Sequence, residues 1–286
     1  SDQTSIEKME DVSLGLLDED LTPWLTEGLR RHGMGIHPAA GKLHSLTSTG
    51  RLVEGIRRVV AGGSFSAFSG LARHPLVLKR LPMRTDHKGT EVEVLKDLDR
   101  WSTERQPDQA EDPNAPPALL HLQEQLSPLM SDEDLLHLRI DQYLQVLGNL
   151  VGTDADGFPL IPEGEGDLLI ETLEKLRECG PQTELRLAAD NFVSLVCALT
   201  MDSLIPEEND PSSIQGLGWL ELAMDEAPHL ILTGISEGKL SGSLTSDPLI
   251  PESLRRELGI PGYEERVARD THLLRSLVDG RRHTVV

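Results

Sequence analysis

The chain has 286 residues, a net charge of −21, 38% apolar residues and 26% charged residues. This balance excludes a disordered chain, because disorder requires low hydrophobicity together with unrelieved charge. Only 3% of the residues are aromatic, which argues against an all-β sandwich or barrel and against ligand binding by ring stacking. The length allows one large domain or two of ordinary size.

The charges are distributed unevenly along the chain. Residues 30–88 contain eleven Lys and Arg residues and two acidic residues, so this segment carries +9 and the remainder carries −30. A basic segment of this kind attracts phosphates or an acidic protein surface. The alternative is that the acidic remainder of the same chain neutralises it.

Helical spacing of apolar residues dominates the N-terminal third. It predicts helices over residues 21–29, 52–60 and 91–101. Residues 62–70 consist mainly of Gly, Ser and Ala, which predicts a loop, and that loop contains Phe65 and Phe68. Because two of the four Phe residues lie there, we expect this loop to contact a partner.

Residues 105–117 contain four prolines among acidic and amide residues, a composition typical of a linker or long loop. Beyond it, apolar spacing predicts helices over 118–126, 132–151, 167–178, 182–201, 212–226, 229–236, 251–258 and 262–279. We therefore predict an all-α protein. Its expected parts are a smaller helical N-terminal region (1–104) with the basic segment 30–88, the linker 105–117, and an acidic helical array (118–286).

One tetrapeptide occurs three times in the C-terminal two thirds. Leu160-Ile161-Pro162-Glu163 recurs at 204–207 and at 249–252, after intervals of 44 and 45 residues. A period of roughly 40–47 residues is typical of helical repeats of the HEAT and armadillo type. The sequence therefore predicts a solenoid-like array, with an irregular helical bundle that reuses one loop motif as the alternative.

The catalytic and cofactor motifs that we sought are incomplete or absent. The segment 35–43 has two glycines and a lysine, as a phosphate loop does, but its spacing is one residue too long and Leu43 replaces the required hydroxyl residue. The sequence has no nucleophile elbow and no zinc-binding helix motif. The acidic runs 18–20 and 132–134 are interpreted as solvated faces or helix starts. We expect no cofactor and a binding role, with a helical enzyme whose site combines distant residues as an alternative.

Residues 152–163 match part of the pattern of a calcium-binding EF-hand loop. Asp154, Asp156 and Glu163 occupy positions 3, 5 and 12, and Gly157 occupies the turn position 6. However, Gly152 stands where the first Asp is required, so the loop offers too few anionic oxygens. We predict an Asx-type turn between two helices in preference to a calcium site.

The leading functional hypothesis is a non-enzymatic interaction or scaffold module that binds a protein partner through a helical surface and the basic segment. The alternative is a nucleic-acid-associated protein, viral or chromatin-linked, that uses residues 51–88 on phosphates. The candidate partner-binding residues are Arg51, Arg57, Arg58, Phe65, Phe68, Lys79, Arg80, Arg84 and Lys88. In addition, Thr284 and Val286 fit the pattern of a C-terminal ligand of PDZ domains.

Cysteine content and hydropathy address the compartment. Cys179 and Cys197 cannot form a disulfide framework, and we interpret both as buried thiols in a reducing compartment. No apolar run approaches the ~18 residues of a membrane span, and the acidic N-terminal segment is unlike a signal peptide. We expect an intracellular protein, cytoplasmic or nuclear.

Overall fold

A computed structural model describes residues 8–18, 21–81, 90–105, 112, 114–130, 133–179, 184–206, 212–236 and 250–285. The chain divides into two compact units. The first unit comprises residues 1–41 and 206–286, and the second comprises residues 42–205, so the second is inserted into the sequence of the first. These boundaries differ from the division expected at residues 105–117, which fall within the second unit.

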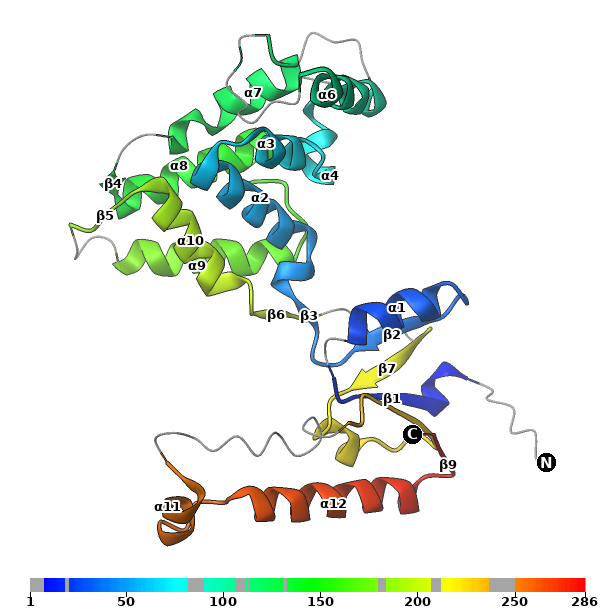
Figure 1. Ribbon diagram of the computed structural model, residues 1–286. Coiled ribbons are helices and arrows are strands. Elements are labelled where there is room, and N and C mark those ends of the chain that lie inside the picture. The colour runs from blue at the N-terminus through cyan, green and yellow to red at the C-terminus, as the bar shows by residue number, and fades with distance from the viewer. Residues whose placement is uncertain are drawn as a thin grey trace. The chain divides into compact units, whose positions relative to one another are not determined.

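The first unit is built on a five-stranded parallel sheet (Figure 1). In spatial order its strands are β2 (Gly35–Pro38), β7 (Ser213–Leu217), β1 (Val12–Leu16), β8 (His229–Thr233) and β9 (His283–Val285). The central strand β1 pairs with β7 on one side and β8 on the other, so that Ser13 lies opposite both Gln215 and Leu230. The sheet therefore joins segments from the two ends of the chain.

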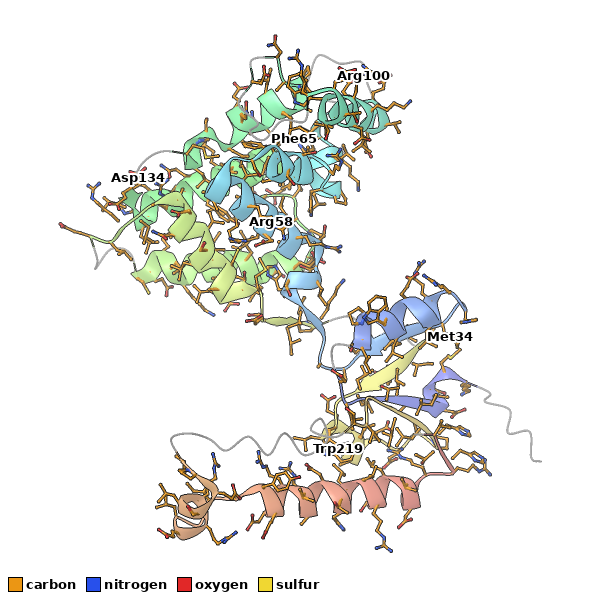
Figure 2. The ribbon with its side chains drawn as sticks, viewed as in Figure 1. Met34, Arg58, Phe65, Arg100, Asp134 and Trp219 are labelled. Atoms are coloured by element: carbon orange, nitrogen blue, oxygen red, sulfur yellow. The ribbon has the colours of Figure 1, made fainter. Side chains whose placement is uncertain are left out.

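One helix covers each face of this sheet, α1 (Thr22–Arg30) on one side and the longer α12 (Tyr263–Gly280) on the other (Figure 1). Side chains of a strand alternate between faces, so Val12, Leu14 and Leu16 share one face and pack with residues of α1. On the other face, Leu230 and Leu232 of β8 pack against Leu277 of α12. Figure 2 labels a member of each apolar cluster, Met34 on the α1 side and Trp219 on the α12 side. The remaining short elements of this unit are η1 (Met9–Asp11), η6 (Glu221–Met224) and α11 (Glu252–Glu257).

The second unit is helical. Its helices are α2 (Ser48–Gly62), α3 (Phe65–Ala72), α4 (Pro75–Leu78), α6 (Glu91–Arg105), α7 (Pro117–Leu126), α8 (Leu136–Val151), α9 (Glu165–Cys179) and α10 (Ala189–Thr200). They share one apolar core, in which Tyr143 of α8 meets Phe192 of α10 edge to face with ring centroids 5.7 Å apart. Two short antiparallel ribbons complete the unit, β3 (Lys42–Leu43) with β6 (Leu204–Ile205) and β4 (Asp134–Leu135) with β5 (Arg186–Leu187). The 3-10 turns are η3 (His44–Leu46) and η4 (Ser127–Leu129).

The prediction of an all-α fold is wrong. Residues 212–226 and 229–236, both predicted as helices, contain β7, η6 and β8. These strands are only five residues long, and such a length displays too little alternation to be separated from helical spacing. The other helices predicted from residue 118 onward are confirmed as α7 to α12, although α8 starts at Leu136 and α10 at Ala189 because β4 and β5 precede them.

The prediction of HEAT-like repeats is also wrong, because the three tetrapeptides occupy different structures. Residues 160–163 form the turn before α9, whereas Leu204 and Ile205 form strand β6. In the third copy Pro251 is the N-cap of α11, and residue 249 lies outside the described residues. What the first two copies share is partial or full burial of Ile161 and Ile205.

Residues 62–70 do not form the predicted loop. Ser64 caps α3 by accepting a hydrogen bond from the amide of Ala67, and the helix continues to Ala72. Phe65, Phe68 and Leu71 follow at helical spacing and are buried in the core. The helical stripe of apolar residues therefore outweighs the local abundance of Gly and Ser.

No helix within the described ranges is both long and apolar enough to cross a bilayer.

A buried arginine fixes the irregular segments of the second unit to α8. Arg139 is fully buried, and its guanidinium donates to the backbone oxygens of Leu187 and Leu129 at 3.0 and 3.4 Å and to the Gln142 side chain at 3.0 Å. Gln142 in turn donates to Asp134 at 2.8 Å. This chain of hydrogen bonds connects β4, β5 and η4 to one helix.

Replacing Arg139 with Met is expected to lower the free energy of unfolding by about 2–4 kcal/mol, because the buried carbonyl group of Leu129 and the partly buried carbonyl group of Leu187 lose their donor. Urea denaturation followed by circular dichroism measures this change. The matched control is Arg100→Met on α6 (Figure 2), whose side chain is 67% exposed and whose loss should cost less than about 0.5 kcal/mol. Equal effects of the two substitutions would contradict the role assigned to Arg139.

Candidate functional site

Within the basic segment, α2 and α3 are consecutive helices with a tight connection. Thr47 caps the start of α2 by accepting from the amide of Gly50, and Gly63 ends it with a left-handed φ of +57°. Ser64 then starts α3 immediately. Because only two residues separate the helices, their apolar faces enter the same core and their polar faces stand side by side.

A groove of about 640 Å³ runs along these polar faces. From α2 it is lined by three arginines and one glutamate, and its other walls are mostly Gly, Ala and Ser. The lining residues are Arg51, Glu54, Gly55, Arg57, Arg58, Ala61, Gly62, Ser64, Ser66, Ala67, Gly70, Leu71 and His74. A β-carbon added at Gly62 or Gly70 would meet no atom within 4 Å, so the walls leave room for a bound segment.

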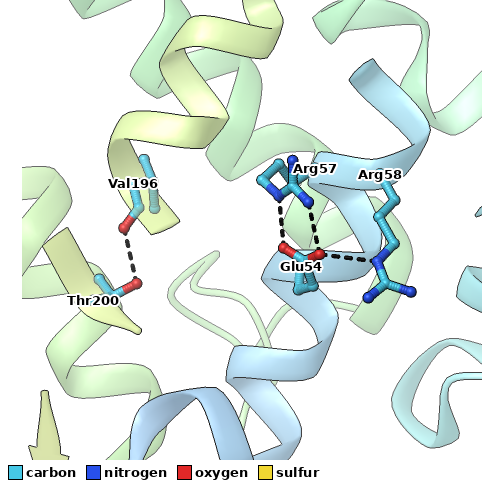
Figure 3. Close-up of polar contacts among 5 residues, drawn as sticks. All are labelled: Glu54, Arg57, Arg58, Val196 and Thr200. Carbon is cyan, nitrogen blue, oxygen red and sulfur yellow. Dashed lines mark hydrogen bonds and ion pairs between the residues drawn. The ribbon is translucent and has the colours of Figure 1, made fainter. Parts of the chain in front are cut away.

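One carboxylate, that of Glu54, forms ion pairs with two of the three arginines in the groove (Figure 3). Glu54 accepts two hydrogen bonds from Arg57, at 2.6 and 2.8 Å, and one from Arg58 at 2.9 Å. The spacings i+3 and i+4 place both guanidinium groups beside the carboxylate on one helix face. Their hydrogen bonds and charge lower the pKa of Glu54 to about 2, so it is ionised throughout the physiological range.

The third arginine has a different environment. The Arg51 guanidinium donates to the backbone oxygens of Thr47 and Leu46, both at 3.2 Å. In the described part of the chain it forms no salt bridge to a carboxylate. Three arginines and one glutamate give the groove a formal charge of +2 within a chain that carries −21.

A second groove of about 580 Å³ lies elsewhere on the helical unit. Its described lining is Val60, Leu129, Met130, Glu133, Ala188, Ala189 and Asp190, in which the charged groups are two carboxylates. It has no arrangement of donors that would hold an anion, and we place the candidate site at the α2–α3 groove.

Two buried histidines lie at the N-terminal end of α2. His74 is 9% exposed, and its Nε2 lies 3.0 Å from the carbonyl oxygen of Ser48 while Nδ1 is buried without a hydrogen-bond partner. His44 is fully buried, and its ring lies close to the backbone of Thr200 and Glu165. Beside them, Glu165 accepts from the amide and hydroxyl of Thr49 at 2.9 and 3.0 Å.

Burial lowers the pKa of both histidines below the ordinary value of 6.5. The Glu165 carboxylate opposes this shift for both rings, and Arg51 adds to it for His74. Because the unfolded chain binds these protons more readily than the folded one, the free energy of unfolding falls as the pH drops below about 6.5.

His44→Phe is expected to reduce the loss of stability between about pH 7 and pH 5, because one buried proton-binding site is removed. The measurement is urea denaturation at both pH values, comparing the pH-dependent difference within each variant. His32→Phe, at an exposed position of the first unit, is the control. If His44→Phe keeps the full pH dependence of the wild type, His44 is not the source of that dependence.

The structure separates the sequence-predicted partner-binding residues into distinct environments. Arg51, Arg57 and Arg58 line the groove, and Lys79 is exposed after α4. Phe65 and Phe68, 7% and 3% exposed, belong to the core, which corrects the expectation that a loop presents them to a partner. Arg84 and Lys88 lie outside the described residues.

Arg80 packs across the end of α8. A β-carbon at Gly152 would collide with the Arg80 guanidinium, and the Arg80 Nε is buried without a hydrogen-bond partner. The absence of a β-carbon at residue 152, together with its φ of +90°, therefore makes room for this side chain. Arg80 does not line the groove with Arg51.

The loop that matches part of the EF-hand pattern is an Asx turn, as predicted. The Asp154 carboxylate accepts from the amides of Asp156 and Phe158 at 3.0 and 2.9 Å. Its oxygen is therefore engaged by the backbone of its own loop, and Glu163 lies in the turn before α9. Among the described residues, no three or more His, Cys, Asp or Glu side chains are grouped to hold a metal ion.

The C-terminal segment and the cysteines also differ from simple expectation. Thr284 lies in β9, paired opposite Leu230, whereas a PDZ ligand needs a free strand; Val286 lies outside the described residues.

Cys197 is buried, which raises its pKa to about 11, but Cys179 is exposed at the end of α9 and not buried as predicted.

The sequence analysis did not identify Glu54, His74 or the small groove residues as parts of one site. The i, i+3, i+4 order of Glu54, Arg57 and Arg58 was a readable signal for the ion-paired triad. The groove walls from α3 gave no such signal, because Ser66, Ala67 and Gly70 become neighbours of the arginines only after α3 packs beside α2.

A scan of the sequence against protein-family models found no match, and a comparison with curated protein sequences also found none.

Proposed function

We propose that this protein is a non-enzymatic interaction module that binds an acidic segment of a protein partner in the α2–α3 groove. The observation that carries this proposal is the excess of arginine over carboxylate in a groove with small walls. Charge complementarity of this kind steers association and selects partners. The small side chains let the backbone of the bound segment approach the helices.

The spacing of the arginines suggests the form of the partner segment. Arg51 and Arg58 are seven residues apart on α2, which is about 10.5 Å along the helix axis and nearly the same face. In a polyproline II segment, residues three apart lie on one edge and are separated by about 9.3 Å. An extended acidic segment with carboxylates at every third residue therefore matches the two arginines.

The groove favours an acidic protein segment over the two alternative functions. Single-stranded nucleic acid is typically held by base stacking on aromatic rings, and the described lining contains no aromatic ring of Phe, Tyr or Trp. Catalysis would require an accessible base, whereas His74 Nδ1 is buried and its Nε2 faces the Ser48 carbonyl.

The test measures binding to the full-length chain by fluorescence anisotropy. The probes are a labelled twelve-residue peptide that repeats Glu-Pro-Pro, its Gln-Pro-Pro counterpart and an oligothymidylate. We expect the acidic peptide to bind and the amide peptide not to bind. Tighter binding of the oligothymidylate than of the acidic peptide would replace the proposal with the nucleic-acid alternative.

Arg51→Gln combined with Arg58→Gln is expected to weaken acidic-peptide binding at least about tenfold. These two guanidinium groups keep donors that can bind a partner carboxylate, and the substitutions remove both. The melting temperature should change by no more than a few degrees, since exposed charges contribute little to stability. The matched control is Arg30→Gln with Arg31→Gln, an exposed arginine pair on α1 outside the groove. Equal loss in both double variants would indicate a nonspecific charge effect and contradict the site.

Filling the groove should also block binding. Gly70→Gln adds a side chain where no atom lies within 4 Å, so we expect lost peptide binding and a stability gain of about 0.5–1 kcal/mol from helix propensity. Gly28→Gln makes the same change at an exposed, open position of α1 and should leave binding intact. Wild-type affinity in the Gly70→Gln variant would place the binding surface elsewhere.

A further inference from the structure

We infer that Glu54 acts as a resident counter-ion of the α2–α3 groove: it occupies the arginines that would otherwise bind a partner carboxylate, and thereby limits affinity for acidic segments. This inference rests on the proposed function and concerns the regulation of the same site. The ion pairs of Glu54 with Arg57 and Arg58 compete with the ligand for the same guanidinium groups.

The position of Glu54 supports this role. It lies three residues after Arg51 and four before Arg58, so all three share one face of α2. The Glu54 side chain is 32% exposed and lines the groove, as the partner carboxylate would. A carboxylate within the binding stripe repels an incoming carboxylate and shields the flanking guanidinium groups.

The hydrogen bonds show which donors Glu54 engages. Arg57 uses Nε and one terminal nitrogen on Glu54, a bidentate contact that engages one edge of its guanidinium. Arg58 gives Glu54 only its Nε and is 67% exposed, so its terminal nitrogens face outward. A partner carboxylate can add to Arg58 at once, but can take the Nε edge of Arg57 only by displacing Glu54.

The fold does not depend on the charge of Glu54, because helical ion pairs at i+3 and i+4 between partly exposed side chains contribute little to stability. The low pKa of Glu54 shows that the carboxylate remains charged and in place at physiological pH. The triad is therefore a persistent feature with a small structural role.

The chain contains a matched control for this inference. Glu27-Gly28-Leu29-Arg30-Arg31 on α1 has the same pattern as Glu54-Gly55-Ile56-Arg57-Arg58 on α2. Glu27 likewise accepts from Arg30 at 2.9 and 3.1 Å and from Arg31 at 3.0 Å. These arginines do not line the groove, so local ion pairing is reproduced without the binding site.

The experiment compares Glu54→Gln with Glu27→Gln in the full chain, using the labelled Glu-Pro-Pro peptide. Glu54→Gln keeps the side-chain size and removes one negative charge from the groove; we expect about tenfold tighter binding and a steeper loss of binding with added salt. Glu27→Gln removes the same charge from the whole protein and should bind as the wild type does.

A second substitution separates the local effect from a general one. Adding Arg57→Gln to Glu54→Gln should abolish most of the gain, because the guanidinium edge that Glu54 had occupied is then absent. Circular dichroism and thermal melting confirm that each variant is folded, and Glu54→Asp, which keeps the charge, provides a further folded comparison that should not gain affinity.

The outcomes separate this inference from the proposed function. Wild-type binding of the acidic peptide with equal or weaker binding by Glu54→Gln overturns the counter-ion role and leaves the groove function standing. Equal gains in Glu54→Gln and Glu27→Gln also overturn it, because the effect would then be one of net charge. Absence of acidic-peptide binding in the wild type and in Glu54→Gln overturns the proposed function itself.

Discussion

The pairing of the central strand β1 with both β7 and β8 is the interaction on which the first unit depends. It joins residues 12–16 to residues 213–217 and 229–233, and without it neither α1 nor α12 has a sheet to cover. The entropic cost of joining such distant segments is reduced by the inserted unit. Its own ends are held together by β3 and β6, with Lys42 opposite Ile205, so the 42–205 insertion acts as a short connection between β2 and β7.

Local spacing of apolar residues predicted most of the helices. The strands of the sheet were not predicted, because they form by pairing with segments distant in the sequence. Leu52, Val53, Ile56 and Val59 form a complete apolar stripe within one helix, and the sequence alone predicts it. Leu230 and Leu232 have the i, i+2 spacing of a strand, but five residues show too little of this alternation, and the strand β1 that pairs with β8 is more than two hundred residues earlier. The error at Phe65 and Phe68 has a different cause, since composition was given more weight than the Ser64 cap and the helical spacing that follows it.

The candidate site also combines features that are local in the sequence with contacts between segments that are distant in it. The arginines of α2 could be named from the sequence because charge is a property of single residues. Their grouping into a groove depends on how α3 packs, and the loss of Arg80 from the set depends on Gly152 at the end of α8. The pentapeptides at Glu27 and Glu54 demonstrate the limit: nearly identical segments form the same triad, and only the second lies beside a neighbouring helix with small residues.

The insertion of the helical unit between β2 and β7 has a consequence for biosynthesis. A ribosome that adds ~5–20 residues per second needs on the order of 10–30 s to translate residues 42–205. During that interval the nascent β1 and β2 have no sheet partner, while the helical unit already has the short-range contacts that let it fold. Unpaired strands of apolar character are prone to intermolecular association. The first unit therefore cannot complete its sheet until β7 and β8 have been synthesised, after the whole helical unit.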